Sequence, residues 1–325
     1  MWKKNLTTYF QTIYSVKNLE LFQTQIMSLS CLQHIKRSNN PVNSLDAQAR
    51  PPAPPLASFT GFTGDRSGSM SSMGGKQKEM TYKMIQQVQE DAKKSGVPTF
   101  FDFVTFDDTA EVHLNNVELN HAKLPSPEKI GNCMDPRGCT RYIDTALERL
   151  AAQNHAVTKY RDSLPRRVRA LNPVIAQSYS FLTDGQDNSS NWTAKELFSA
   201  MRLYRKKGGK GIFLAANMDA VSVGGQFGFA PETSLTISAH DHEAIGSGLR
   251  SATQCLRQVS QGANESIAFT GVQRASSAGA GPAAAHVSIN GATRLLRRNV
   301  GPPPGMSRGR NLYYQGLHRS NNGGH

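Results

Sequence analysis

Cysteines are scarce and long apolar runs are absent in this sequence of 325 residues. Four cysteines in a chain of this length are too few for a disulfide scaffold. No stretch approaches the roughly 18 consecutive apolar residues that a membrane-spanning helix needs. There is also no self-similarity at intervals of about 20–50 residues. These absences exclude a disulfide-rich protein and a transmembrane protein, and they argue against a repeat architecture.

Acidic residues are missing from the C-terminal end of the chain. Residues 266–325 carry seven arginines and neither Asp nor Glu, and residues 1–50 carry a net charge of +4. The formal net charge of the whole chain is +13, so residues 51–265 account for only +2, with 24 basic and 22 acidic residues. The positive charge therefore lies in the two ends, and the middle of the chain has the charge balance of an ordinary globular domain.

Composition divides the chain at the same places. Pro51–Pro55 is a short, proline-rich linker. After about residue 274 the sequence is rich in Ala, Gly, Ser, Pro, Arg and Asn, a composition that buries too little apolar surface to offset chain entropy. We therefore expect a poorly ordered N-terminal extension and linker over 1–55, a folded domain over 56–270 and a disordered basic tail over 271–325.

The N-terminal segment lacks the apolar stretch of a secretory signal, which favours a cytoplasmic or otherwise intracellular protein. Glu20 is the only acidic residue before Asp46, as in a mitochondrial presequence, but such presequences are usually rich in arginine and the first arginine is Arg37. Met27 is an alternative start of translation. The sequence leaves both questions open.

Short apolar runs alternate with helical patterns in the middle of the chain. Phe100–Phe106, Tyr179–Leu182 and Ile212–Ala216 have the length and composition of buried strands. Apolar stripes at helical spacing begin at Met80, Ile143, Leu197 and Ile245. This alternation predicts an α/β fold: a three-layer, Rossmann-like, doubly wound and mainly parallel sheet with helices on both faces.

Ligands of such sheets bind beyond the carboxyl ends of the strands. After a first predicted strand (Ser58–Thr63) come Asp65, Ser67 and Ser69, which alternate along the chain so that their oxygens can converge. One carboxylate and two hydroxyls are hard oxygen ligands, which suit Mg²⁺ or Mn²⁺.

Two further segments offer oxygen ligands at predicted strand ends or helix starts. Thr140 precedes the Ile143 helix, and Asp184 directly follows the Tyr179 strand. An isolated Asp-x-Ser-x-Ser segment is most often a turn. Three such pieces in this order, each at an edge where the fold binds ligands, indicate a metal site.

With these motifs the sequence resembles the von Willebrand factor type A (vWA) family over roughly residues 56–262. The metal-ion-dependent adhesion site (MIDAS) of that family reads Asp-x-Ser-x-Ser, then Thr, then Asp. The resemblance implies five metal ligands in this chain: Asp65, Ser67, Ser69, Thr140 and Asp184. It also implies a non-enzymatic, protein-binding module whose bound Mg²⁺ captures an Asp or Glu carboxylate of a partner.

The same resemblance implies further strands. The sequence also departs from the family at two places. Val104–Asp108 corresponds to the second strand and its hairpin, Gly211–Asn217 to the fifth strand and Leu235–Ser238 to a sixth. The first strand is mixed and glycine-rich over Phe59–Gly64, where the family usually has an apolar run, and this places its regularity in question. Lys159–Ala170 is unusually basic.

Residues beside the implied ligands have two interpretations. Asp187 and Asn188 either support the metal ligands as a second shell or are ordinary turn residues. Arg66 lies between two ligands, so we expect it to point away from the metal and toward a partner.

Other chemistry-bearing residues favour simpler roles. No His–Ser or His–Cys pairing suggests catalysis. His240–His242 fits a helix start with Asp241 near its N-terminus better than a metal site. Cys133 and Cys139 lack the second pair that a zinc site needs. The methionines are expected to pack in the core or in loops: Met70, Met73, Met80 and Met84.

The C-terminal tail supplies an alternative function. Its arginines and the nearby Tyr313 and Tyr314 could bind RNA through phosphate contacts and stacking, although a solvated tail without a specific partner is the simpler interpretation. The tail arginines in question are Arg294, Arg297, Arg298, Arg308 and Arg310.

Overall fold

A mainly parallel sheet forms the centre of the protein. The computed structural model describes residues 54–185, 187–262 and 267–279 of the 325. In this part of the chain the sheet has six strands in the order β3-β2-β1-β4-β5-β6, and only β3 runs antiparallel. The strands are β1 (Ala57–Asp65), β2 (Thr99–Phe106), β3 (Ala110–Glu118), β4 (Ile175–Thr183), β5 (Lys210–Ala216) and β6 (Ser234–Ile237). The order reverses direction at β1 and β4, as in a doubly wound fold.

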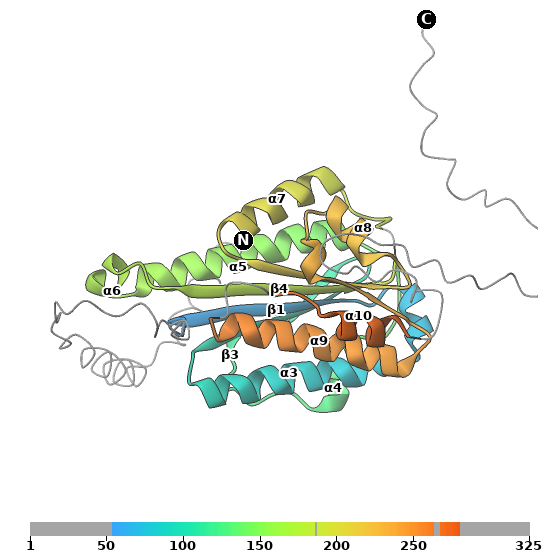
Figure 1. Cartoon of the computed structure of the whole chain (residues 1–325), viewed down its shortest axis with the longest axis horizontal. Helices are drawn as coiled ribbons and strands as arrows, with labels where there is room; N and C mark the ends of the chain where they lie inside the picture. Colours follow the sequence, from blue (N-terminus) through green and yellow to red (C-terminus); the bar gives the residue numbers. More distant parts are fainter. Residues whose placement is uncertain (1–53, 186, 263–266, 280–325) are drawn as a thin grey trace, which may run out of the picture. The chain divides into compact units, whose positions relative to one another are not determined.

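Helices cover both faces of the sheet (Figure 1). One layer contains α5 (Tyr142–Ser163), α7 (Ala194–Lys206) and α8 (Ala220–Gln226), and α6 (Arg166–Ala170) follows α5. The other layer contains α3 (Lys76–Ser95), α4 (Pro127–Asn132), α9 (His242–Ser260) and α10 (Gly271–Ala278). Two 3₁₀ turns, η2 (Gly68–Met73) and η3 (Pro231–Thr233), complete the elements. The predicted three-layer α/β fold is confirmed.

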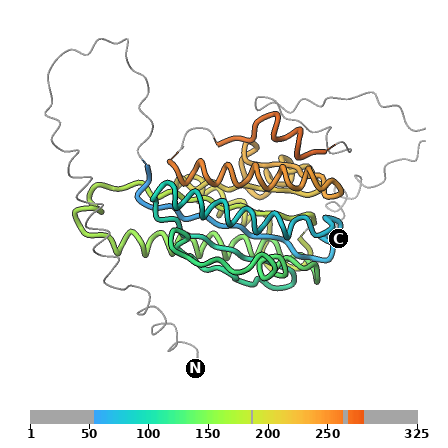
Figure 2. Tube along the Cα trace, turned by 90° about the horizontal axis from the view of Figure 1, so that it is seen from below, coloured from blue at the N-terminus to red at the C-terminus, as the bar shows by residue number. Residues whose placement is uncertain are grey.

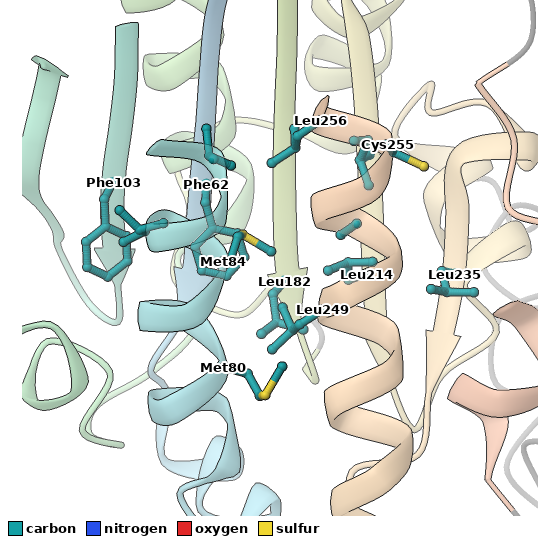
Figure 3. Close-up of a cluster of buried hydrophobic side chains, with 14 of the residues drawn as sticks. Phe62, Met80, Met84, Phe103, Leu182, Leu214, Leu235, Leu249, Cys255 and Leu256 are labelled. Carbon is teal, nitrogen blue, oxygen red and sulfur yellow. The ribbon is translucent and has the colours of Figure 1, made fainter. Parts of the chain in front are cut away.

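The predicted apolar stripes that begin at Met80 and Ile245 form the core between α3, α9 and the sheet. The two helices run side by side across the sheet (Figure 2). Figure 3 shows Met84 of α3 and Leu249 of α9 beside Phe62 and Leu182 of the strands. All four predicted core or loop methionines are buried in this layer, which confirms their packing role: Met70, Met73, Met80 and Met84.

The opposite core is aromatic and fixes the start of α5. The ring of Tyr142, the first residue of α5, lies 5.9 Å from the rings of Phe181 and Phe213 between centroids, with both pairs in edge-on geometry. Tyr142 is only 1% exposed. This packing anchors the residues just before α5, which include Thr140, close to the ends of the strands.

The glycines of β1 make room for large neighbours. A β-carbon at Gly61 would lie 2.6 Å from the ring of Tyr179, and one at Gly64 would lie 2.6 Å from the sulfur of Met134. Nevertheless β1 pairs regularly with β2 and with β4, and all nine of its residues are buried. The glycine-rich first strand is therefore regular, and its glycines mark close approaches.

The predicted end of the domain at residue 270 is too early. Thr270 caps α10, whose Arg274 is buried and donates hydrogen bonds to the carbonyls of Ser234, Pro231 and Glu232 at 2.7–3.1 Å. Because this side chain satisfies three carbonyls at the start of β6, the segment is ordered despite its small residues. Residues 1–53 and 280–325, with the predicted extension and the tail arginines, lie outside the described residues.

Two smaller predictions have clear outcomes. Asp241 caps α9 by accepting hydrogen bonds from the backbone N–H groups of Glu243 and Ala244, at 2.9 and 3.1 Å, so His240–His242 is a helix start as expected. The basic segment Lys159–Ala170 forms the end of α5 and the exposed helix α6.

Across the described ranges, no helix has the length and apolar content to span a membrane.

Candidate metal centre

Neighbouring parallel strands bring two carboxylates to one edge of the sheet. Asp65 is the last residue of β1, and Asp184 follows Thr183, the last residue of β4. The two strands pair in parallel up to Gly64 and Leu182. Their carboxyl ends therefore meet where the fold class predicts a ligand site.

A chain of hydrogen bonds links four of the predicted ligands. The backbone N–H of Ser67 donates to Oδ1 of Asp65 at 2.7 Å. The hydroxyls of Ser67 and Ser69 lie 3.0 Å apart, and Ser69 donates to Oδ1 of Asp184 at 2.7 Å. These residues, which come from β1, η2 and the end of β4, thus form one continuous oxygen-rich group.

Thr140 brings the fifth oxygen to the same place. A β-carbon at Gly185 would lie 3.3 Å from Oγ1 of Thr140 and 3.6 Å from Oγ of Ser69, so both hydroxyls border one small space. The N–H of Thr140 donates to Oδ1 of Asn188 at 2.9 Å, and the N–H of Asn188 donates back to the carbonyl of Thr140 at 3.0 Å. The structure therefore brings together all five residues that the sequence singled out.

Asp187 and Asn188 hold the segment that carries Thr140. Asn188 makes the two hydrogen bonds just described. Asp187 accepts hydrogen bonds from the N–H of Ile143 at 2.7 Å and from the hydroxyl of Ser190 at 2.6 Å, and so ties the start of α5 to the loop after β4. Both residues contact the backbone around Thr140.

The two carboxylates carry uncompensated negative charge. Burial raises the pKa of Asp65 to about 6, against the opposing effect of hydrogen bonds from Thr183 and Ser67, and the charge of Asp184 adds to the rise. Burial also raises the pKa of Asp184, although its hydrogen bond from Ser69 lowers it. No ion pair within the described residues reaches either carboxylate. Two such carboxylates side by side favour a cation between them.

The donor set fits a hard divalent cation. Two carboxylates and three hydroxyls supply only oxygen, the ligand type of Mg²⁺ and Mn²⁺. Nowhere in the described ranges do three His, Cys, Asp or Glu side chains gather as a metal site. The thiol of Cys133 donates to the carbonyl of Lys129 at 3.1 Å, and Cys139 is exposed. The candidate metal ligands at this edge are therefore the oxygen atoms of the five residues, not the thiols of Cys133 and Cys139.

Arg66 does not face a partner, contrary to the sequence prediction. Its side chain is 3% exposed, and its Nε lies 2.9 Å from Oδ2 of Asp107 at the end of β2. Its Nη1 donates to Oε2 of Glu111 on β3 at 2.9 Å. The correction has a simple cause: the β2–β3 hairpin places two carboxylates within hydrogen-bond reach of the guanidinium, and such charge-assisted hydrogen bonds are strong and directional.

Arg137 completes an ion-pair cluster with Arg66, Asp107 and Glu111. It lies 2.7 Å from Asp107 and 2.5 Å from Glu111, and its backbone N–H donates to the carbonyl of Arg66 at 2.6 Å. Burial raises the pKa of Asp107, but the hydrogen bonds from Arg137 and Thr109 and the charge of Arg66 outweigh it, so the net shift is downward. The cluster joins the loop of Ser67 and Ser69 to the loop that leads to Thr140.

Sequence reasoning missed this cluster and the role of Thr183. The hydroxyl of Thr183 donates to Oδ2 of Asp65 at 2.7 Å, beneath the exposed part of the site. Asp107 follows directly after β2, at the same edge as Asp65, and this position was the available signal. The sequence contained no equivalent signal for Glu111 or Arg137.

No protein-family model matches the sequence, and no curated protein is significantly similar to it. Similar solved structures include proximal thread matrix protein 1 from the mussel byssus, at 15% identity and a TM-score of 0.40, over 64% of this chain and 48% of that one. The match thus spans about half of the mussel protein, one structure of which is described as having a zinc-occupied MIDAS motif.

Two further structures carry the vWA name. A von Willebrand factor type A protein from Catenulispora acidiphila is 16% identical with a TM-score of 0.37, over 62% of this chain and 43% of that one. The VWA domain of SpRpn10 is 13% identical with a TM-score of 0.38, over 59% of this chain and 97% of that one. At such identities a likeness concerns the arrangement of strands and helices, and it leaves function to the chemistry of the residues.

Proposed function

We propose that this chain contains a vWA-type domain that binds a partner protein through a divalent cation. Mg²⁺ suits the donor set best, and Mn²⁺ is the closest substitute. One observation carries the proposal: five oxygen-bearing residues from three distant segments meet at one edge of the sheet, and no ion pair in the described residues balances their two carboxylates. These ligands would be Asp65, Ser67, Ser69, Thr140 and Asp184.

The five residues would hold the cation from different sides, according to their charge and exposure. Asp65 is fully buried and is fixed by Ser67 and Thr183, so it would anchor the cation from below. Ser69 is exposed and Asp184 is partly exposed, so they would border the side that faces solvent. A bound Mg²⁺ supplies a positive centre with room for one more oxygen ligand.

A carboxylate of a partner protein is the proposed ligand for that position. An Asp or Glu side chain offers a hard, negatively charged oxygen, which suits the cation better than a neutral group does. The proposed role is non-enzymatic: the five residues supply oxygen atoms that would hold a cation, and their hydrogen bonds fix those atoms in place. The domain would therefore recognise a partner rather than convert it.

Thermal unfolding of the full chain tests the metal site. We expect 10 mM Mg²⁺ to raise the melting temperature of the wild type relative to EDTA, with a stabilisation of about 1 kcal/mol when free metal is a few-fold above its Kd. Asp65→Asn and Asp184→Asn should lose this gain. Asp162→Asn, which removes an exposed carboxylate near the end of α5, is the matched control and should keep it. A wild type that gains nothing, or variants that gain as much as the wild type, would overturn the proposal.

Affinity capture tests the partner. Proteins retained by the wild type in Mg²⁺ should elute with EDTA and should not bind Asp65→Asn. Proteins that stay bound in EDTA and also bind Asp65→Asn would show that the metal does not form the contact. RNA binding through the C-terminal arginines remains the alternative; it rests on tail residues outside the described ones and predicts salt-sensitive RNA instead of chelator-sensitive protein.

A further inference from the structure

The second half of α7 is strongly basic. From Leu197 to Lys210 the sequence contains five Lys or Arg residues and neither Asp nor Glu. Arg202, Arg205 and Lys206 are all exposed. Residues 51–265 as a whole are nearly balanced in charge, so this segment concentrates positive charge at one place on the folded domain.

These cations line a groove between α7 and α8, which lie in the same layer (Figure 1). The α7–α8 groove has a volume of about 460 Å³. Its lining contains three basic residues, two aromatic residues and two glycines, and no acidic residue: Phe198, Arg202, Arg205, Lys206, Gly225, Gly228 and Phe229. The side chain of Phe198 is 40% exposed at this groove, and nothing lies within 4 Å of a β-carbon placed on Gly225. A ligand can therefore reach the exposed part of Phe198 and the backbone at Gly225.

The cations of the groove have no ion pair among the residues that the structure describes. Some cations on other helices are paired, as Lys76 is with Glu79 and Arg141 is with Glu148. Across the described residues, no ion pair involves Arg202 or Lys206. Arg205 donates through Nη1 to the carbonyl of Gly228 at 2.9 Å, which holds its guanidinium at the groove. Like charges gathered on a concave surface repel one another and favour an anionic ligand.

We propose that the α7–α8 groove binds the phosphate backbone of a single-stranded nucleic acid. Arg202 and Lys206 contact phosphates, Arg205 adds a fixed positive charge, and the exposed ring of Phe198 stacks with a base. Two arginines and an accessible aromatic ring match phosphate and base recognition better than they match an acidic peptide, which offers no flat ring. Trp192, 55% exposed just before α7, provides a second aromatic surface near the other end of the helix.

This surface is separate from the metal centre. Asp184 lies before the N-terminal end of α7, whereas Arg202, Arg205 and Lys206 lie in its last two turns. A helix of 13 residues is about 20 Å long, so one ligand at the metal centre would leave the groove free. The proposal therefore does not depend on metal binding, and the two can fail independently.

Fluorescence anisotropy with a labelled 20-nucleotide single-stranded RNA and the full chain tests the proposal. Arg202→Gln combined with Lys206→Gln should weaken binding at least tenfold at 100 mM salt. The slope of log affinity against log salt should become shallower by about 1.4, because two phosphate contacts are lost at about 0.7 each. Phe198→Ala should weaken binding about tenfold and leave the slope unchanged, because stacking releases no counterions.

Arg166→Gln combined with Arg167→Gln is the matched control, because it removes two exposed charges from α6. This pair should change affinity by less than about twofold. Equal losses of RNA affinity in both double variants would show that binding depends on overall positive charge and not on the groove, and would overturn the proposal. Unchanged binding in the groove variants, with loss on removal of residues 280–325, would assign RNA to the tail. Competition by polyglutamate as strong as by unlabelled RNA would instead identify an acidic protein ligand.

Discussion

The two ends of α7 have opposite charge imbalances. Asp65 and Asp184 lie together at the strand ends before α7, Arg202 and Lys206 lie together near its C-terminal end, and none of the four has an ion pair among the described residues. Elsewhere in the described domain opposite charges do pair closely, as the ion-pair cluster of Arg66 shows. Unpaired charges of one sign that gather at one place are therefore candidate positions for a ligand of the opposite charge.

The contrast between Arg66 and Arg202 makes the same point for one residue type. Arg66 is buried, contacts two carboxylates and joins the β2–β3 hairpin to the metal-site loop. Arg202 is exposed and lines an open groove. The first arginine should therefore matter for stability, and the second should matter for binding.

The largest expected effect comes from breaking the buried ion pair. Arg66→Met leaves the carboxylate of Asp107, which is 6% exposed, without its buried partner. We expect the free energy of unfolding to fall by about 3–5 kcal/mol, measured by urea denaturation. Arg137→Gln is the control, because the Arg137 side chain is 57% exposed and its loss should lower the free energy of unfolding much less. Equal losses would contradict the assignment of Arg66 as the buried anchor.

Neutralising the buried carboxylate should have the next largest effect, in the opposite direction. Asp65→Asn should raise the free energy of unfolding at pH 7.5 in EDTA by about 1–2 kcal/mol, because it removes a buried charge beside Asp184. It should also abolish the response to Mg²⁺. A less stable variant in EDTA would show that the hydrogen bonds from Ser67 and Thr183 outweigh the charge.

The same carboxyl predicts a pH dependence. Because its pKa is raised from 3.8 to about 6 in the folded state, the folded protein holds this proton more tightly than the unfolded chain does. Its contribution to the free energy of unfolding should therefore fall as the pH rises from about 4 to about 6, and should level off above that range. Comparing urea midpoints of wild type and Asp65→Asn in EDTA across this range isolates the effect. A difference that does not vary with pH would rule out Asp65 as the titrating group.

A smaller effect should follow from loosening the segment that carries Thr140. Asn188→Ala removes the acceptor for the Thr140 N–H but leaves all five proposed ligands in place. We expect a loss of about 1 kcal/mol in stability and about a tenfold weaker affinity for Mg²⁺, measured by titration calorimetry. Asn132→Ala, at an exposed position at the end of α4, should change neither. Unchanged Mg²⁺ affinity in Asn188→Ala would make Asn188 an ordinary turn residue.

The sequence predicted the sheet and the five candidate ligands for one physical reason. Buried strands, amphipathic helices and the residues just beyond strand ends leave local patterns, and parallel pairing of β1 with β4 brings Asp65 and Asp184 together without further information. The partners of Arg66 left no such pattern. Asp107 and Glu111 are 41 and 45 residues away, and their contact depends on the geometry of the β2–β3 hairpin.

The end of the domain was missed for a related reason. The residues of α10 are small and polar, so composition places them with the tail. The helix is held by Thr270 at its start and by the buried Arg274, whose guanidinium satisfies carbonyls about 40 residues earlier in the chain. A single long-range side chain therefore decides where the fold ends, and average composition is insensitive to it.

The smallest expected effect belongs to the groove and completes the comparison. Arg202→Gln combined with Lys206→Gln should change the free energy of unfolding by less than about 0.5 kcal/mol, because both side chains are exposed and neither has an ion pair within the described residues. Removing two like charges beside Arg205 could only relieve repulsion. Thermal melts of this variant and the wild type, in buffer with EDTA and without RNA, should therefore coincide. A loss of stability as large as that of Arg66→Met would mean that the groove cations stabilise the fold. The positive charge of the groove would then serve stability and not ligand binding.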